Sequence, residues 1–188
     1  FNQVVIKVVN EGLQPAYFAG LRSAGGVLVL ISWMWWRGLS LRITPGTWWV
    51  GLIIGCLFAT EFLLLFRAPD LTTVVRSGGI FYSMPVWLAL MSHFVLPADR
   101  MSLSKASGLA LAFAGVVFAI ATRGDLSGGS LLGDLFALGA AVGWACTALM
   151  AKASRLRHET PEVQLLWQLA VSTPIMLGAA FLSGPLIR

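Results

Sequence analysis

The sequence predicts an all-α membrane protein, a polytopic helix bundle, and three observations carry this prediction. Hydrophobic residues make up 57% of the 188 residues and charged residues only 11%, whereas a soluble domain has about a quarter of its residues charged. The mean hydropathy is +0.82. Six apolar runs reach the length of about 20 residues that a helix needs to cross the hydrocarbon core. A surface of this composition suits lipid rather than water.

Seven hydrophobic segments follow one another along the chain. The first, Phe1–Val9, is too short to span a bilayer and is predicted to be the second half of a helix whose beginning is missing. The other six are predicted membrane helices: Pro15–Trp36, Gly46–Phe66, Leu71–Leu96, Leu103–Thr122, Leu131–Ala153 and Pro161–Ser183. Because the connections are short, we expect consecutive helices to lie side by side and antiparallel.

Small residues and prolines predict details of these helices. Small residues four apart allow helix backbones to approach closely, and they occur in three sets: Gly51 and Gly55; Gly139 and Gly143; Ala106, Ala110 and Ala114. The run Leu71–Leu96 contains the adjacent residues Gly78 and Gly79, which weaken a helix, and Pro85, which interrupts one. We therefore expect this helix to bend.

Basic and aromatic residues predict the orientation in the membrane. Three alternate connections with their flanking residues hold most of the positive charge and are expected to face the cytoplasm; their basic residues are Arg37, Arg42, Arg100, Lys105, Lys152, Arg155 and Arg157. Five tryptophans flank the first of these connections: Trp33, Trp35, Trp36, Trp48 and Trp49. We interpret them as an aromatic belt at the membrane surface, with an aromatic cage for a ligand as the alternative.

Charge and motif content argue against several other classes. The net charge is +5, but the basic residues form no stripe with interleaved aromatic residues, so nucleic acid is not an expected partner. Cys56 and Cys146 lie inside apolar runs, which predicts neither a disulfide nor a zinc site. His93 and His158 have no Ser or Cys nucleophile close in sequence, and no phosphate-binding or metalloprotease motif occurs. The sequence therefore predicts no catalytic residues and no metal site.

A weak internal similarity relates two distant segments. Pro15 precedes Arg22 by seven residues, and Pro161 precedes Gln168 by the same spacing. Five predicted helices separate the equivalent positions, and an odd number reverses the direction across the membrane. The sequence therefore predicts an inverted repeat of five-helix units, the architecture of many secondary transporters.

Three stretches of the chain carry a resemblance to a known family. The opening Phe-Asn-Gln-Val-Val-Ile-Lys and the run from Pro15 to Arg22 resemble the start of an EamA-type transporter of the drug/metabolite transporter superfamily. Arg76 with the run Tyr82–Trp87 is similar to the fourth segment of that family, and Gly108–Gly115 to its fifth. The resemblance implies ten helices in two five-helix repeats, transport of metabolites or drugs, and no bound cofactor.

The resemblance also predicts how the chain is organised. Residues 1–123 would form the first repeat with a truncated first helix, residues 124–130 a linker, and residues 131–188 the first two helices of a truncated second repeat. The chain is thus expected to be incomplete. Its expected location is the bacterial inner (plasma) membrane, as a multi-pass protein. The expected partners are a small-molecule substrate and the lipid bilayer, with a homodimer as an open alternative.

The expected activity is secondary transport by alternating access, with efflux as the expected direction. Two other classes are weighed against it. An intramembrane enzyme would need a nucleophile and a base at matching depth, and the sequence offers no such pair. A retinal-type seven-helix receptor would need a lysine inside its last helix, and Pro161–Ser183 contains none.

Polar residues inside the apolar runs are the candidates for the substrate cavity, because a charge at a helix centre costs about 2.5–3.5 kcal/mol. Glu61 and Arg76 lie at similar distances from a turn expected at Pro69, which makes them predicted partners. Their pair would be a structural ion pair or part of a site for substrate or protons; the third alternative is that Arg76 extends to the membrane surface. Arg22 either extends to the membrane surface or holds an anionic group in the cavity. The remaining candidates, for which interhelical hydrogen bonds are the alternative, are Tyr82, Gln168 and Asn2.

Overall fold

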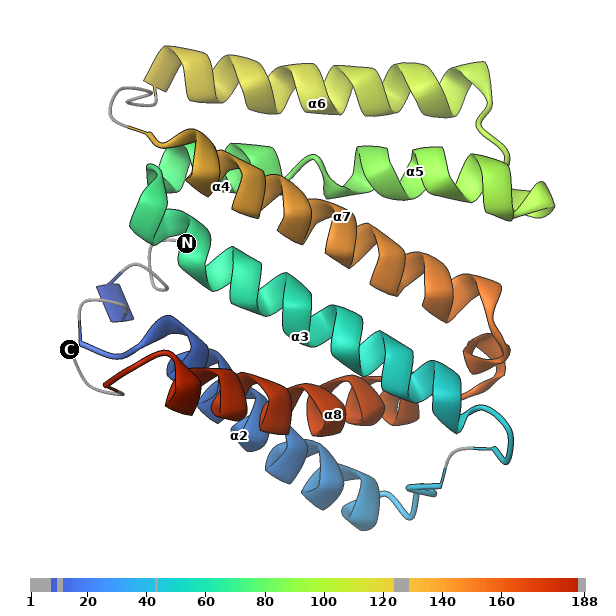
Figure 1. The fold of residues 1–188 in the computed structure, drawn as a ribbon. Helices are drawn as coiled ribbons and strands as arrows, with labels where there is room; N and C mark the ends of the chain where they lie inside the picture. Colours follow the sequence, from blue (N-terminus) through green and yellow to red (C-terminus); the bar gives the residue numbers. More distant parts are fainter. Residues whose placement is uncertain (1–7, 10–11, 43, 124–128, 186–188) are drawn as a thin grey trace.

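The fold is a bundle of long helices, seen in a computed structural model that describes residues 8–9, 12–42, 44–123 and 129–185 (Figure 1). The helices are α2 (Pro15–Trp36), α3 (Trp48–Leu71), α4 (Val74–Phe81), α5 (Met84–Val95), α6 (Leu103–Arg123), α7 (Leu131–Ala153) and α8 (Pro161–Leu182). Two short 3-10 helices, η1 (Pro97–Asp99) and η2 (Arg155–His158), lie in connections. The predicted half-helix at Phe1–Val9 lies almost wholly outside the described residues.

Five described helical stretches are long and apolar enough to cross a membrane by length and composition: α2, α3, the stretch Val74–Val95 that joins α4 and α5, α7, and α8. They coincide with five of the six predicted runs. The remaining run forms α6, and its membrane crossing stays a prediction. The prediction of an all-α, polytopic membrane fold is confirmed.

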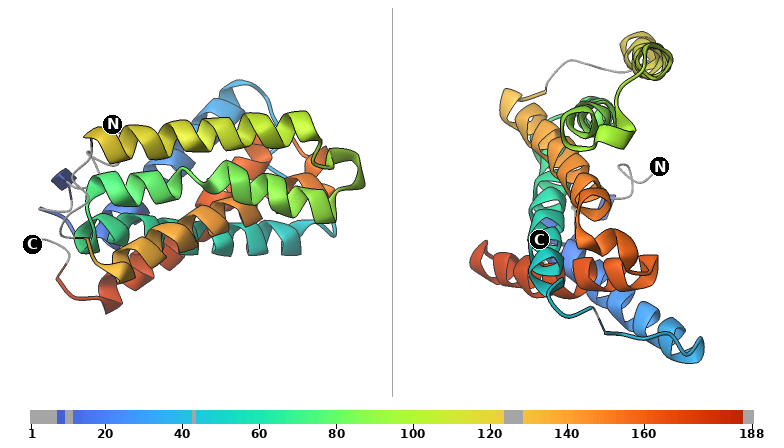
Figure 2. Two further views of the ribbon diagram at one scale, coloured as in Figure 1. Left: turned by 90° about the horizontal axis from the view of Figure 1, so that it is seen from above. Right: turned by 90° about the vertical axis from the view of Figure 1, so that its right-hand side faces the viewer.

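Helix packing departs from the order of the chain. α3 packs mainly against α7 and α8, α2 packs mainly against α8, and α4 and α5 lie along α7. Figure 2 shows α6 at the edge of the bundle, where it contacts α4 and α5. Consecutive α2 and α3 do contact each other, as expected, but their more extensive contacts are with α7 and α8. Short connections fix only the ends of two helices, whereas small-residue faces decide which helices approach closely.

Two of the three predicted small-residue faces make such contacts. Each of these four glycines contacts a larger residue of a facing helix: Gly51 faces Trp167, Gly55 faces Val171, Gly139 faces Leu64 and Gly143 faces Glu61. A Cβ atom at Gly51 would lie 3.0 Å from the Trp167 ring. On α6, by contrast, Ala110 and Ala114 are exposed. The third face is thus largely exposed among the described residues, with Ala106 half-buried.

The predicted bend occurs between α4 and α5. α4 ends at Phe81, α5 begins at Met84, and Tyr82 and Ser83 lie between them. Pro85 occupies the first turn of α5, where a missing backbone N–H leaves no hydrogen bond unmade. The Ser83 hydroxyl accepts a hydrogen bond from the indole nitrogen of Trp87 at 3.1 Å and donates one to the Ile80 carbonyl at 2.6 Å, which fixes the bend.

The three connections that are predicted to face the cytoplasm lie together at one end of the bundle (Figure 1). The backbone N–H of Thr44 donates a hydrogen bond of 2.9 Å to the carboxylate of Glu159, which joins the first connection to the third. The five tryptophans at this end are exposed, and the rings of Trp48 and Trp49 stack with centroids 3.8 Å apart. Their exposure fits an aromatic belt; which side of the membrane they occupy stays a prediction.

Candidate functional site

Glu61 is the one charged side chain that is fully buried in the described part of the chain. It lies in the middle of α3 and is 1% exposed. Gly143 of α7 makes room for it, since a Cβ atom on that glycine would lie 3.3 Å from the Cβ of Glu61. Its Oε2 atom has no hydrogen-bond partner among the described residues. An unpartnered buried acid costs folding free energy, so packing alone does not explain this residue.

A cavity of about 160 Å³ opens beside Glu61. Its walls come from three helices and consist of Phe58 and Glu61 of α3, Trp144, Thr147 and Ala148 of α7, and Gln168 of α8. The spacing of three and four residues places each set on one face of its helix. The cavity thus combines one carboxylate, one hydroxyl and one amide with two aromatic walls.

Arg22 of α2 lies next to this site but does not pair with the acid. The guanidinium carbon lies 4.4 Å from the centroid of the Phe62 ring and 5.8 Å from that of Phe66, which is cation–π geometry. The arginine is close enough for its charge to interact with the Glu61 carboxylate. The ion pairs found among the described residues nevertheless do not join the two.

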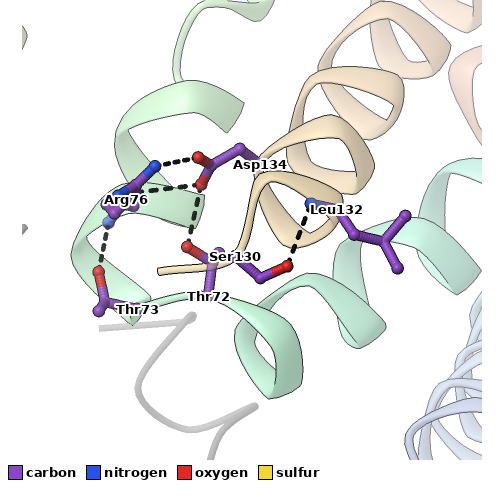
Figure 3. Close-up of polar contacts among 6 residues, drawn as sticks. All are labelled: Thr72, Thr73, Arg76, Ser130, Leu132 and Asp134. Carbon is purple, nitrogen blue, oxygen red and sulfur yellow. Dashed lines mark hydrogen bonds and ion pairs between the residues drawn. The ribbon is translucent and has the colours of Figure 1, made fainter. Parts of the chain in front are cut away.

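The predicted pair of Glu61 and Arg76 is wrong. Arg76 pairs with Asp134 of α7, and both oxygens of that carboxylate take part (Figure 3). The error arises because α3 continues through Pro69 and ends at Leu71. Glu61 therefore lies ten residues, about 15 Å, before the end of its helix, while Arg76 lies in the first turn of α4. The two charges are at different depths.

The Arg76–Asp134 pair is part of a polar cluster that joins the ends of α3, α4 and α7 (Figure 3). Nε of Arg76 and the Thr72 hydroxyl both donate to Oδ1 of Asp134, at 3.2 and 2.9 Å. Thr73 caps α4 by accepting from the backbone N–H of Arg76 at 3.2 Å. Ser130 caps α7, and its backbone N–H donates to the Leu71 carbonyl at 3.1 Å. This cluster is a joint between helices, with Asp134 at its centre.

The other predicted site residues lie in different parts of the structure. Gln168 lines the cavity with Glu61, and Arg22 lies close by. Tyr82 lies at the α4–α5 bend, is 50% exposed and does not line the cavity. Asn2 lies outside the described residues. Of the predicted residues that the structure describes, only Glu61 and Gln168 therefore line the same cavity.

The sequence reasoning missed Asp134 as well as the aromatic and hydroxyl walls at Phe58, Trp144 and Thr147. Asp134 had a usable signal, because it is an acid in the first turn of a helix, four residues after the capping residue Ser130. The residues of the cavity walls gave no such signal in the sequence, since aromatic residues and threonine are ordinary in apolar helices. Within the described ranges, no group of His, Cys, Asp and Glu side chains comes together that could hold a metal ion.

Comparison with known proteins identifies the family. Residues 1–121 match the model of the EamA-like transporter family. The protein belongs to this family. This EamA-like chain is also 32% identical over 170 residues to an uncharacterized transporter of Bacillus subtilis (strain 168), YvbV, a match that covers 89% of this chain and 52% of the relative. The chain therefore spans about half the length of that curated relative.

A solved structure supports the same fold for the EamA-like chain. A crystal structure described only as that of a protein superposes with a TM-score of 0.74 and 25% sequence identity, over 92% of this chain and 60% of its own. Together with the apolar helices, the family match makes this an integral, multi-pass membrane protein. The cavity brings together α3, which lies inside the family match, and α7 and α8, which follow it.

Proposed function

We propose that this protein is a secondary transporter that exports small metabolites or drugs by alternating access, in the bacterial inner (plasma) membrane. The family match and the naming of the Bacillus relative as a transporter support transport as the general activity. The predicted orientation supports a cytoplasmic position for the loops that join α2 to α3, α5 to α6 and α7 to α8.

One observation carries this proposal: Glu61 is buried in the middle of a membrane helix, beside a cavity, and its Oε2 atom has no partner among the described residues. Ionisable residues inside membrane helices are costly and mark substrate or ion pathways. A scaffold acid would instead be surrounded by donors, as Asp134 is. Glu61 is therefore the residue that we assign to the transport pathway.

The packing of α2 against α8 supports the proposed inverted repeat. Gly20 of α2 faces Leu177 of α8, and Gly26, farther along α2, faces Leu169, which lies earlier in α8. The two helices are thus antiparallel, as equivalent helices of inverted repeats must be. The matched positions Arg22 and Gln168 both lie close to Glu61. In the proposed cycle, the two repeats rock around this shared acid.

The test is transport into inside-out membrane vesicles, with a panel of fluorescent drugs and radiolabelled metabolites. We expect uptake of at least one compound by the wild-type protein and a loss of about tenfold or more for Glu61→Gln, which keeps the side-chain volume but removes the charge. Glu162→Gln is the matched control, because Glu162 is an acid in the first turn of α8 away from the cavity. Unchanged transport by folded Glu61→Gln would contradict the proposal.

A further inference from the structure

The polar groups of the cavity are hydrogen-bond acceptors more than donors. Glu61 offers an oxygen that has no partner within the described part of the chain. The Thr147 hydroxyl already donates to the Gly143 carbonyl at 3.0 Å, so the lone pairs of its oxygen are what it can present to a ligand. Gln168 adds an amide, whose carbonyl oxygen accepts and whose NH2 group donates. A ligand group that matches this set must carry several donors and a positive charge, which describes an ammonium group.

The aromatic walls also suit a cation. Phe58 and Trp144 line the cavity on two helices, and the faces of such rings attract ammonium groups. The same aromatic row already binds a cation, because the Arg22 guanidinium lies over Phe62, whose ring centroid is 4.5 Å from that of Phe58. The cavity therefore has aromatic walls of the kind that hold the Arg22 guanidinium one helical turn away.

The size of the cavity sets the size of the ligand. A cavity of about 150 Å³ accommodates a benzene molecule, and this one measures about 160 Å³. A single aromatic ring or a short aliphatic chain with its amine fits such a volume, whereas a larger drug would extend beyond it.

Arg22 opposes a second cation by its charge, but it does not block the cavity. The cavity walls come from α3, α7 and α8, and none of its lining residues belongs to α2. The guanidinium lies over Phe62 and Phe66 instead. An anionic ligand would need Arg22 as its partner, whereas a cationic ligand would bind better without it. This difference distinguishes the two ligand classes.

Building on the proposed transport function, we propose that the cavity binds the protonated amine of a small substrate. Glu61 is the anionic contact, Thr147 and Gln168 are neutral hydrogen-bond partners, and Phe58 and Trp144 are the aromatic walls.

The test is isothermal titration calorimetry on the protein in lipid nanodiscs with three probes of similar size: 2-phenylethylamine, 2-phenylethanol and phenylacetate. We expect the amine to bind to the wild type and to the control Glu162→Gln, and Glu61→Gln to weaken its binding about tenfold or more, because a hydrogen bond to a charged group is lost. Arg22→Gln should tighten amine binding, since a repelling charge is removed. The alcohol and the carboxylate should bind more weakly than the amine.

Two results would overturn the proposal: equal binding of the amine and the alcohol, or amine binding that is unchanged in Glu61→Gln. Tighter binding of phenylacetate that is lost in Arg22→Gln would assign the site to anions and would overturn it as well. If Glu61→Gln does not fold, Thr147→Val provides the test, and unchanged amine affinity in that variant contradicts the proposal.

The vesicle assay separates this inference from the transport function. Export of non-amine compounds that depends on Glu61, together with no amine binding, would reject the amine site and retain transport. Amine binding that depends on Glu61, with no transport of any compound, would reject the transport function and retain the site.

Discussion

Two acidic side chains of this protein, Asp134 and Glu61, differ in their surroundings. Asp134 lies at the end of α7, and the guanidinium of Arg76 and the hydroxyl of Thr72 engage its carboxylate. Glu61 lies in the middle of α3, is 1% exposed and keeps Oε2 without a partner among the described residues. A fully engaged acid stabilises the contact between helices. An acid with an open oxygen beside a cavity costs stability and is available for a ligand.

The largest effect on stability is expected from breaking the Arg76–Asp134 pair. Arg76→Gln or Asp134→Asn leaves the other charge without its partner, and we expect each to lower the free energy of unfolding by about 2 kcal/mol, since the pair is only partly buried. Thermal unfolding in detergent measures this. The double variant should recover part of the loss, because it leaves no unpaired charge. Additive losses would indicate that the two residues act separately.

Two glycines of α7 provide the second comparison between the regions. A Cβ atom at Gly133 would lie 2.8 Å from backbone atoms of Leu71 and Thr72, whereas one at Gly143 would lie 3.3 Å from the Glu61 side chain. Gly133→Ala must move the backbone and should cost about 1–2 kcal/mol. Gly143→Ala should be close to neutral in stability, because its tighter contact is offset by the helix preference of alanine. Equal losses in thermal unfolding would contradict this contrast.

The smallest effect is expected at an exposed ion pair, Asp99 with Lys105, which serves as a reference for both regions. The hydrogen bond and charge of Lys105, 2.8 Å away, lower the pKa of Asp99. A lowered pKa stabilises the folded state above the ordinary carboxyl pKa, and this stabilisation is lost as the pH falls through the lowered value. Lys105→Gln should raise the Asp99 pKa in a carbon-13 NMR titration. It should leave thermal unfolding at neutral pH unchanged, because exposed pairs contribute little. A clear loss of thermal stability in Lys105→Gln would show that the Asp99–Lys105 pair contributes more than its exposure indicates.

The fold was largely predictable from the sequence, because lipid imposes a simple rule on helix length and composition. The apolar runs gave five helical stretches that meet the length for crossing, and Gly78, Gly79 and Pro85 marked the bend between α4 and α5. These features are local: each depends on residues within one run. The packing of α2 on α8 is not local, and neither loop length nor periodicity determines it.

The candidate site was predictable only in part. Glu61 and Gln168 stood out because polar groups are rare in hydrocarbon, and both line the cavity. The sequence does not predict the partner of Arg76, because Asp134 is 58 residues away and because Pro69 indicates a turn. A proline in the last turn of a helix removes a single hydrogen bond, so α3 continues past it. Because the turn lies a few residues later than Pro69, Arg76 lies at a different depth from Glu61.

The most direct test of the account compares Glu61→Gln with Asp134→Asn, each assayed for folded yield in detergent and for transport per folded molecule in vesicles. Both variants exchange an acid for its amide, so they differ only in the surroundings of that acid. We predict that Glu61→Gln keeps the folded yield and loses transport by about tenfold or more, while Asp134→Asn loses folded yield and keeps the transport of the molecules that fold. The reverse pattern, with transport lost in folded Asp134→Asn and retained in Glu61→Gln, would contradict the assignment of Asp134 to the scaffold and of Glu61 to the site.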